Sequence, residues 1–248
     1  GTYAFYACTS LPAVAVGSGV RRIEANAFQS CTRLAEVTMA NNVTTLGNYA
    51  FDSCPSLASV WLGSGVTSIG DSAFNGCASL RDILIPGGVA TIRTRTFAGC
   101  GSLTNVTIPP GVTNIGTYAF HACSNLPQVA VGDGVRRIEA NAFQSCSRLA
   151  QVGFSGSVTN IGTYAFDSCR GLGEVSIPGS VLQLGDYAFA SCSGLTNLQL
   201  GAGVANLGSH VFDSCSQLRG VAFPDSVTNL GSHVFYFCTS LAEAGLGV

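Results

Sequence analysis

Apolar residues recur along this chain at one fixed interval of 23 residues, which its eleven cysteines mark from Cys8 and Cys31 through to Cys238. Leu stands three residues after every Cys, and apolar residues stand six, eight, twelve and fifteen residues after it. A constant period predicts a solenoid, in which each repeat is one structural unit stacked on near-identical neighbours. The architecture therefore follows from the spacing alone.

Each unit divides into a strand and an outer turn. The spacing L-x-x-V-x-L alternates inward and outward, which predicts a short strand such as 105–108 with one buried face. Gly or Pro ends most of these strands. A residue able to cap a helix, such as Thr117 or Asp186, precedes the motif A-F-x-x-C, which predicts a short helical turn. In the two repeats that break this pattern, Asn26 and Asn141 are expected to cap one residue later.

One complete unit reads Leu103-Thr-Asn-Val106-Thr-Ile108-Pro109-Pro-Gly-Val112-Thr-Asn-Ile115-Gly-Thr-Tyr-Ala119-Phe120-His-Ala-Cys123. It resembles the BspA-like (Treponema-type) leucine-rich repeat family, whose units read LxxLxLPxxLxxIxxxAFxxC. The match recurs in ten successive units. The resemblance implies an α/β repeat solenoid, a right-handed curved stack with a concave parallel β-sheet and short helical turns on the convex side. It also implies one domain over residues 1–248, and a role in adhesion and protein binding at a cell surface.

The composition narrows the class of partner. Only 10% of the residues are charged, all eleven basic residues are Arg, and the formal net charge is -2, so nothing favours nucleic acid or anionic lipid. We find no run of 18 apolar residues and no signal-peptide pattern, and predict no membrane span in this segment. Both ends fall within a repeat and carry no polar cap, so we expect a segment of a longer protein, with assembly through the uncapped ends as one possibility. Residues 2–37 and 117–152 are nearly identical in sequence, which indicates that a block of five repeats was duplicated.

The cysteines admit three interpretations: a disulfide ladder, metal ligands or buried thiols. Side chains in register point the same way, eleven is an odd number, and there is no C-x-x-C pair. We therefore expect buried, unpaired thiols that pack as small apolar groups, and no metal or cofactor.

The three histidines are His121, His210 and His233. The last two share a column with Tyr164 and Tyr187, so these four rings are expected to stack as a ladder on the outer side of the solenoid. The ladder covers the convex surface, or alternatively forms an aromatic binding stripe or a pH-sensitive seam. No column of carboxylates pairs with these histidines, so a Ser-His-Asp site is not expected.

Two columns of the predicted strand, five and seven residues after each Cys, point outward and vary freely. Since the fixed columns carry the fold, binding is expected to reside in these free ones. The only Trp, Trp61, is expected to stand exposed beside Leu84, either as an aromatic interface anchor or as an isolated aromatic of the kind that strand surfaces often carry. The predicted protein-binding site on the concave face consists of Trp61 and Leu84 with Glu36, Thr38, Asp82 and Thr107 at its rim.

Two weaker signals lie near this site. Glu36 and Asp82 stand two repeats apart, about 10 Å, a separation compatible with a glycosidase pair. An open sheet without an enclosing pocket argues against that activity. The sequons at Asn42 and Asn105 are candidate glycosylation sites.

Taken together with the resemblance, which implies the surface and adhesion role, these patterns predict a non-enzymatic protein-binding module of a surface or secreted adhesion-type protein, whose partner is a protein or cell-surface ligand. The alternative is a structural spacer or accessory subunit docked in a larger assembly. No activated nucleophile, metal set or phosphate-binding loop is evident in the sequence. The resemblance implies a location that is extracellular or at the cell surface.

Overall fold

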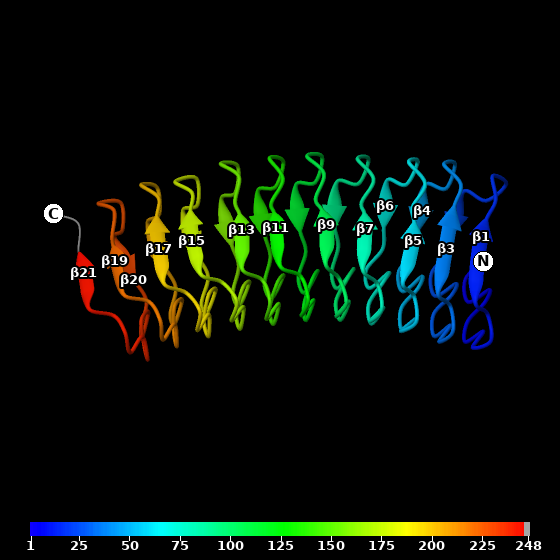
Figure 1. Cartoon of the computed structure of the whole chain (residues 1–248). Helices are drawn as coiled ribbons and strands as arrows, with labels where there is room; N and C mark the ends of the chain where they lie inside the picture. Colours follow the sequence, from blue (N-terminus) through cyan, green and yellow to red (C-terminus); the bar gives the residue numbers. More distant parts are fainter. Residues whose placement is uncertain (246–248) are drawn as a thin grey trace.

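A computed structural model describes residues 1–245 as coils stacked side by side in one gently bent row, with β1 and β21 at opposite ends (Figure 1). Each coil contributes one longer strand, which carries an odd number. These strands are β1 (Ala13–Val16), β3 (Glu36–Met39), β5 (Ser59–Trp61), β7 (Asp82–Leu84), β9 (Asn105–Thr107), β11 (Gln128–Ala130), β13 (Gln151–Gly153), β15 (Glu174–Ile177), β17 (Asn197–Leu200), β19 (Gly220–Ala222) and β21 (Glu243–Gly245).

A second, two-residue strand follows in the same coil and carries an even number. These strands are β2 (Arg22–Ile23), β4 (Thr45–Leu46), β6 (Ser68–Ile69), β8 (Thr91–Ile92), β10 (Asn114–Ile115), β12 (Arg137–Ile138), β14 (Asn160–Ile161), β16 (Gln183–Leu184), β18 (Asn206–Leu207) and β20 (Asn229–Leu230). Both sets pair in parallel, and each residue faces the one 23 positions later, as Val37 faces Val60. The constant repeat length thus fixes the register of the whole stack.

The pairing of the odd strands is not continuous. The first five strands form one sheet, β1-β3-β5-β7-β9, and the others form the pairs β11-β13, β15-β17 and β19-β21. The even strands form a three-stranded sheet, β2-β4-β6, and a seven-stranded sheet from β8 to β20. Direct pairing on the odd side is therefore interrupted after β9, β13 and β17.

The core is built from the fixed apolar columns that the sequence indicates. Leu57, Val60, Val66 and Ile69 of one coil are all buried, and the same columns are buried in the coils on either side. Successive Phe rings from Phe5 to Phe235 stack along the axis with centroids 4.9–5.7 Å apart. The ring stack contacts residues that directly follow the odd strands, since the ring of Phe154, just after β13, lies 5.6 Å from the ring of Phe166.

The predicted helical turn is wrong, because the residues that the structure describes contain no helix. Tyr49 and Ser53 have φ angles of 58° and 57°, in the left-handed region, and the same two columns are left-handed in the other coils. The N–H groups of Tyr49, Phe51 and Ser53 point to the next coil and bond to the carbonyls of Asp71, Ala73 and Asn75 at 2.8–2.9 Å. A helix would bond these groups within its own coil. Here the neighbouring coil satisfies them, so the segment is a series of tight turns.

The residues expected to cap that helix also have a different role. The side chain of Asn48 accepts a hydrogen bond from the backbone N–H of Asp71 at 2.9 Å, and Asp186 accepts one from Ser209 at 2.7 Å. These bonds join one coil to the next. Asn26 instead donates to the side chain of Gln29 at 2.7 Å, and it does not act as a cap.

Candidate functional site

The outward side chains of the odd strands form one exposed surface, here called the strand face. In β5 and β7 the burial alternates exposed, buried, exposed, which puts Val60 and Ile83 in the core and leaves their neighbours in solvent. The two free columns of the sequence therefore do lie on the outside of the sheet, as predicted.

Trp61 and Leu84 are the most exposed large apolar side chains among residues 1–245, at 64% and 65%. They lie on neighbouring strands, with Thr38 in register beside Trp61 and Thr107 in register beside Leu84. Between β5 and β7 the register pairs only Ser59 with Asp82, at the opposite end of the strands from the two apolar groups. A shallow groove of about 440 Å³ opens at the end of the strands that carries Trp61 and Leu84. It is lined by Trp61 and Leu84 with Asn41, Leu62, Ser64, Ile85, Pro86 and Gly87.

The four predicted rim residues are all exposed and lie beside this groove, outside its lining. Glu36 and Asp82 both pair with Ser59, so one carboxylate stands on each side of that serine. The structure thus gathers Glu36, Thr38, Asp82 and Thr107 around the two apolar side chains. The sequence prediction missed Asn41, Ser64 and Pro86, which lie in the turns after β3, β5 and β7 and line the groove. Of these, Pro86 was interpreted only as the end of a strand.

The strand face carries charge of one sign. The two outward columns contain Glu36, Asp82, Glu174 and Glu243, and contain no Arg and no His. Their formal charge is therefore -4, whereas the whole chain has -2. This surface disfavours polyanions and favours neutral or cationic groups.

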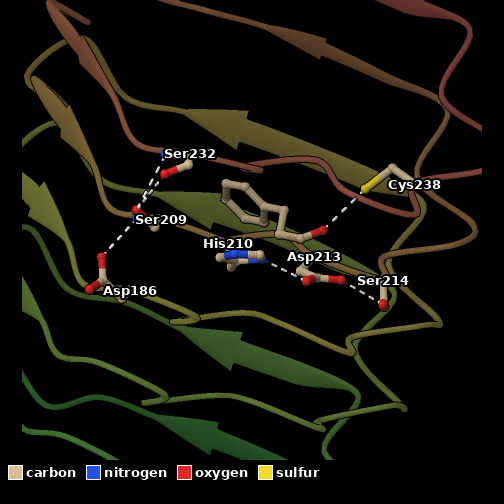
Figure 2. A network of polar contacts seen from close by, with 8 residues as sticks. Asp186, Ser209, His210, Asp213, Ser214, Ser232 and Cys238 are labelled. Carbon is tan, nitrogen blue, oxygen red and sulfur yellow. Dashed lines mark hydrogen bonds and ion pairs between the residues drawn. The ribbon is translucent and has the colours of Figure 1, made fainter.

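The predicted ring ladder is confirmed on the turn side of the solenoid. Tyr164, Tyr187, His210 and His233 stack with centroids 4.6–4.8 Å apart and nearly parallel planes. The prediction that no carboxylate pairs with these histidines is wrong for one of them. His210 Nδ1 lies 2.8 Å from a carboxylate oxygen of Asp213, as Figure 2 shows.

The same view shows why this pair is not a catalytic triad. Ser214 donates to Asp213 at 2.6 Å and makes no bond to the imidazole (Figure 2). The neighbouring serines, Ser209 and Ser232, belong to the ladder of bonds between coils that begins at Asp186. The cluster therefore links neighbouring turns by hydrogen bonds. Because Ser214 bonds to Asp213 and not to the imidazole of His210, its hydroxyl has no general base.

The cysteines are all free, and every one except the half-buried Cys8 is buried. Each thiol from Cys31 onward donates to the carbonyl of a Phe 26 residues earlier, as Cys100 does to Phe74. Burial raises the pKa of Cys54 and of Cys100 to about 12, so these thiols are neutral. Within residues 1–245, no three His, Cys, Asp or Glu side chains converge as a metal site would require.

The two sequons differ in their surroundings. The side chain of Asn42 donates to the backbone carbonyls of Ser18 and Val20, the latter at 3.0 Å. Asn105 is exposed on the strand face, at the start of β9. Glycosylation at either position stays a prediction.

A family model described as "BspA type Leucine rich repeat region (6 copies)" matches residues 1–127 and 113–242 of this chain. The chain belongs to this leucine-rich repeat family. The resemblance of the repeat unit is thereby confirmed, and the left-handed turns described above are the form that its A-F-x-x-C segment takes in this chain.

Solved structures of bacterial leucine-rich repeat proteins share the fold. One from Bacteroides ovatus is 27% identical with a TM-score of 0.75, over 98% of this chain and 75% of that one. A leucine-rich cell surface protein from Faecalibacterium prausnitzii is 28% identical with a TM-score of 0.60, over 96% of this chain and 79% of that one. The T. pallidum leucine-rich repeat protein is 28% identical with a TM-score of 0.60, over 75% of this chain and 78% of that one.

No curated protein matches the chain. The part of the chain that the structure describes contains no helix long and apolar enough to cross a bilayer.

Proposed function

We propose that this chain is a non-enzymatic protein-binding module of a surface or secreted adhesion-type protein, and that it binds through the strand face at Trp61 and Leu84. The exposure of this pair supports the proposal most strongly. In the same coils the large apolar residues Leu57, Leu62 and Ile85 are buried, whereas these two stand about two-thirds exposed on adjacent strands. An exposed Trp beside an apolar neighbour is the usual anchor of a protein interface.

The surroundings of the pair fit that role. Thr38 and Thr107 flank it in register, and Glu36 and Asp82 stand close by. An apolar centre with a polar rim is the common anatomy of a protein-binding patch. The solved relative from F. prausnitzii is described as a cell surface protein, which supports the proposed location.

The experiment uses a displayed library of folded protein domains, selected against the native chain. The double variant Trp61→Ala/Leu84→Ser removes the anchor, and should weaken selected binders at least tenfold. The matched control is Tyr49→Ala/Leu182→Ser, because these side chains are also exposed but lie off the strand face. Binders that tolerate the first variant and lose affinity to the second would place the contact elsewhere.

The alternative proposal is a structural spacer or docked subunit, and a different observation favours it. Tyr49 and Leu182 are 43% and 57% exposed and lie off the strand face. Sedimentation velocity distinguishes the two functions. Reversible self-association that Tyr49→Ala/Leu182→Ser abolishes, and that Trp61→Ala/Leu84→Ser leaves unchanged, would favour the structural function.

A further inference from the structure

A second feature of the strand face lies next to the Trp61 groove and is polar. Two hollows of about 440 and 520 Å³ open over β9–β13 and β13–β17, and they share Gln151 and Gly153. They form one continuous depression, here called the amide trough. Its polar lining consists of Asn105, Thr107, Gln128, Gln151, Glu174, Ser176, Asn197 and Gln199.

The trough exists because of two properties of these coils. Its floor carries small residues in the second outward column, namely Ala130, Gly153 and Ser176, where Trp61 and Leu84 stand in earlier coils. It also spans the interruptions in strand pairing after β9 and after β13. Small side chains over loosely paired strands leave the surface hollow.

The side chains along the trough have unused hydrogen-bonding groups. Among the described residues, the side-chain amides of Asn105, Gln128, Gln151 and Asn197 make no hydrogen bond to protein, and the side chain of Gln199 makes one long contact of 3.5 Å to Ser176. On the turn side, by contrast, Gln144 both accepts from Asn141 and donates to Asp167, at 2.9 Å each. A primary amide presents two donors and an acceptor, which matches the alternating N–H and C=O groups of a peptide main chain.

The charge and the lining narrow the class of ligand. The strand face bears four carboxylates and no cation in its outward columns, so a nucleic acid would be repelled. The trough lining contains no aromatic side chain on which a sugar ring could stack. Glu174 lies within the trough and favours a Lys or Arg on the ligand.

We propose that the amide trough binds the main chain of an extended, neutral or basic peptide segment that runs along the solenoid axis. The amides of Gln128, Gln151 and Asn197 bond to its backbone, and an apolar side chain of the same segment packs on Trp61 and Leu84. From β7 to β17 there are five repeats, or about 24 Å, which an extended chain covers in about seven residues. The inference rests on the proposed protein-binding function and names its ligand.

Gly153 gives a sharp test. A Cβ built there meets its nearest atom at 3.9 Å, and its φ is not left-handed, so a side chain fits without strain. Gly153→Leu therefore fills the trough and leaves the fold intact. The matched control is Gly156→Leu, an open turn glycine with nothing within 4 Å of its Cβ.

The probe is a phage library of random 12-residue peptides, panned against the native chain and resynthesised for fluorescence polarisation. We expect enriched peptides to carry Lys or Arg and an apolar residue. Gly153→Leu should reduce the affinity for these peptides at least tenfold, and Gly156→Leu should reduce it less than twofold. N-methylation of the peptide's central backbone amides should also reduce its affinity at least tenfold. Recognition of the peptide's side chains alone would not produce this loss. If Gly153→Leu fails to fold, Gln128→Ala/Gln151→Ala replaces it, because both side-chain amides are exposed and bond to no other residue within 1–245.

The outcomes separate this inference from the proposed function. Loss of binding with Gly153→Leu and with Trp61→Ala/Leu84→Ser supports both, and loss with Gly153→Leu alone supports the trough and contradicts the anchor. Loss with Trp61→Ala/Leu84→Ser alone keeps the function and overturns the trough. Three further results overturn the trough as a peptide site: no enriched peptide, enrichment of acidic peptides, or a neutral glycan panel that binds and is blocked by Gly153→Leu.

Discussion

The thiol of Cys100 donates a hydrogen bond to the backbone carbonyl of Phe74 in the preceding coil, with Sγ 3.3 Å from the oxygen. The same carbonyl accepts the N–H of Cys77 at 3.2 Å. Each Cys–Phe contact therefore links two coils through the wall of the core. This relationship explains why the column holds cysteine, a small apolar residue that can still donate.

Cys100→Ala tests that bond. The substitution removes the S–H donor and leaves a small cavity, but the Phe74 carbonyl keeps its bond from Cys77, so we expect a cost of about 1–2 kcal/mol. Phe97→Ala removes a fully buried ring and should cost about 3–5 kcal/mol. Urea denaturation of the two variants gives the comparison. An equal loss for both would show that the thiol does more than donate one weak bond.

Alkaline pH should destabilise the stack steeply. Burial raises the pKa of Cys54 and of Cys100 from 9.0 to about 12, so the folded chain holds these protons when the unfolded chain has released them. The contribution of these buried thiols to the free energy of unfolding is complete below pH 9 and falls as the pH rises toward 12. Unfolding midpoints in urea at pH 8, 9 and 10 measure this trend. A constant midpoint over that range would contradict the buried-thiol account.

The same burial predicts unequal reactivity of the thiols. Only Cys8 is partly exposed, so a disulfide reagent at pH 8 should modify about one thiol rapidly in the folded chain. Unfolding in guanidinium should make all eleven thiols react with the reagent, because none is in a disulfide bond. Rapid modification of several thiols in the native chain, or fewer than eleven after unfolding, would each refute this arrangement.

Acid sensitivity is expected at His121. Burial, with the nearby charge of Arg95, lowers the pKa of this imidazole from 6.5. The unfolded chain therefore takes up the proton first, and the stability that His121 provides is complete above pH 6.5 and declines as the pH falls below it. Other repeats carry Gln at this position, as Gln29 and Gln144 do. The variant His121→Gln should therefore lose less unfolding free energy than the native chain between pH 7.5 and pH 5. Equal losses for variant and native chain would exclude His121 as the cause.

Two glycines should respond in opposite ways to alanine. A Cβ on Gly70 would lie 2.5 Å from backbone atoms of Gly47 and Asn48 in the preceding coil, so Gly70→Ala should push coils apart and cost roughly 2–4 kcal/mol. Gly153 has no such contact, and Gly153→Ala should change stability by less than about 0.5 kcal/mol. Thermal unfolding of both variants tests the difference. Similar losses would mean that close approach of the coils is not what requires glycine.

Most of the fold could be predicted from the sequence, because a fixed period of 23 residues determines the register, and alternation around Val60 and Ile83 determines which side is buried. The helical turn could not, since A-F-x-x-C has the same apolar spacing in a helical turn and in the observed series of turns. What decides between them is the neighbouring coil, which accepts the N–H of Tyr49 and Phe51 and so permits left-handed residues.

The candidate site was only partly predictable for a similar reason. The exposure of Trp61 and Leu84 follows from their columns, but the groove beside them depends on turn residues such as Pro86. The contact between His210 and Asp213 had a signal in their spacing of three residues, which was overlooked. The small residues Ala130, Gly153 and Ser176 likewise indicated a depression, but the loosened strand pairing beneath it required the structure.

Fluorescence of Trp61 tests the central claim most directly, because it is the only Trp in the chain and is 64% exposed. A Trp-free binder obtained from the domain library is titrated into the native chain while emission and acrylamide quenching are recorded. Docking on the strand face predicts a blue shift of the emission maximum and a several-fold drop in the quenching constant at saturation. An unchanged spectrum and unchanged quenching with the binder fully bound would contradict the account.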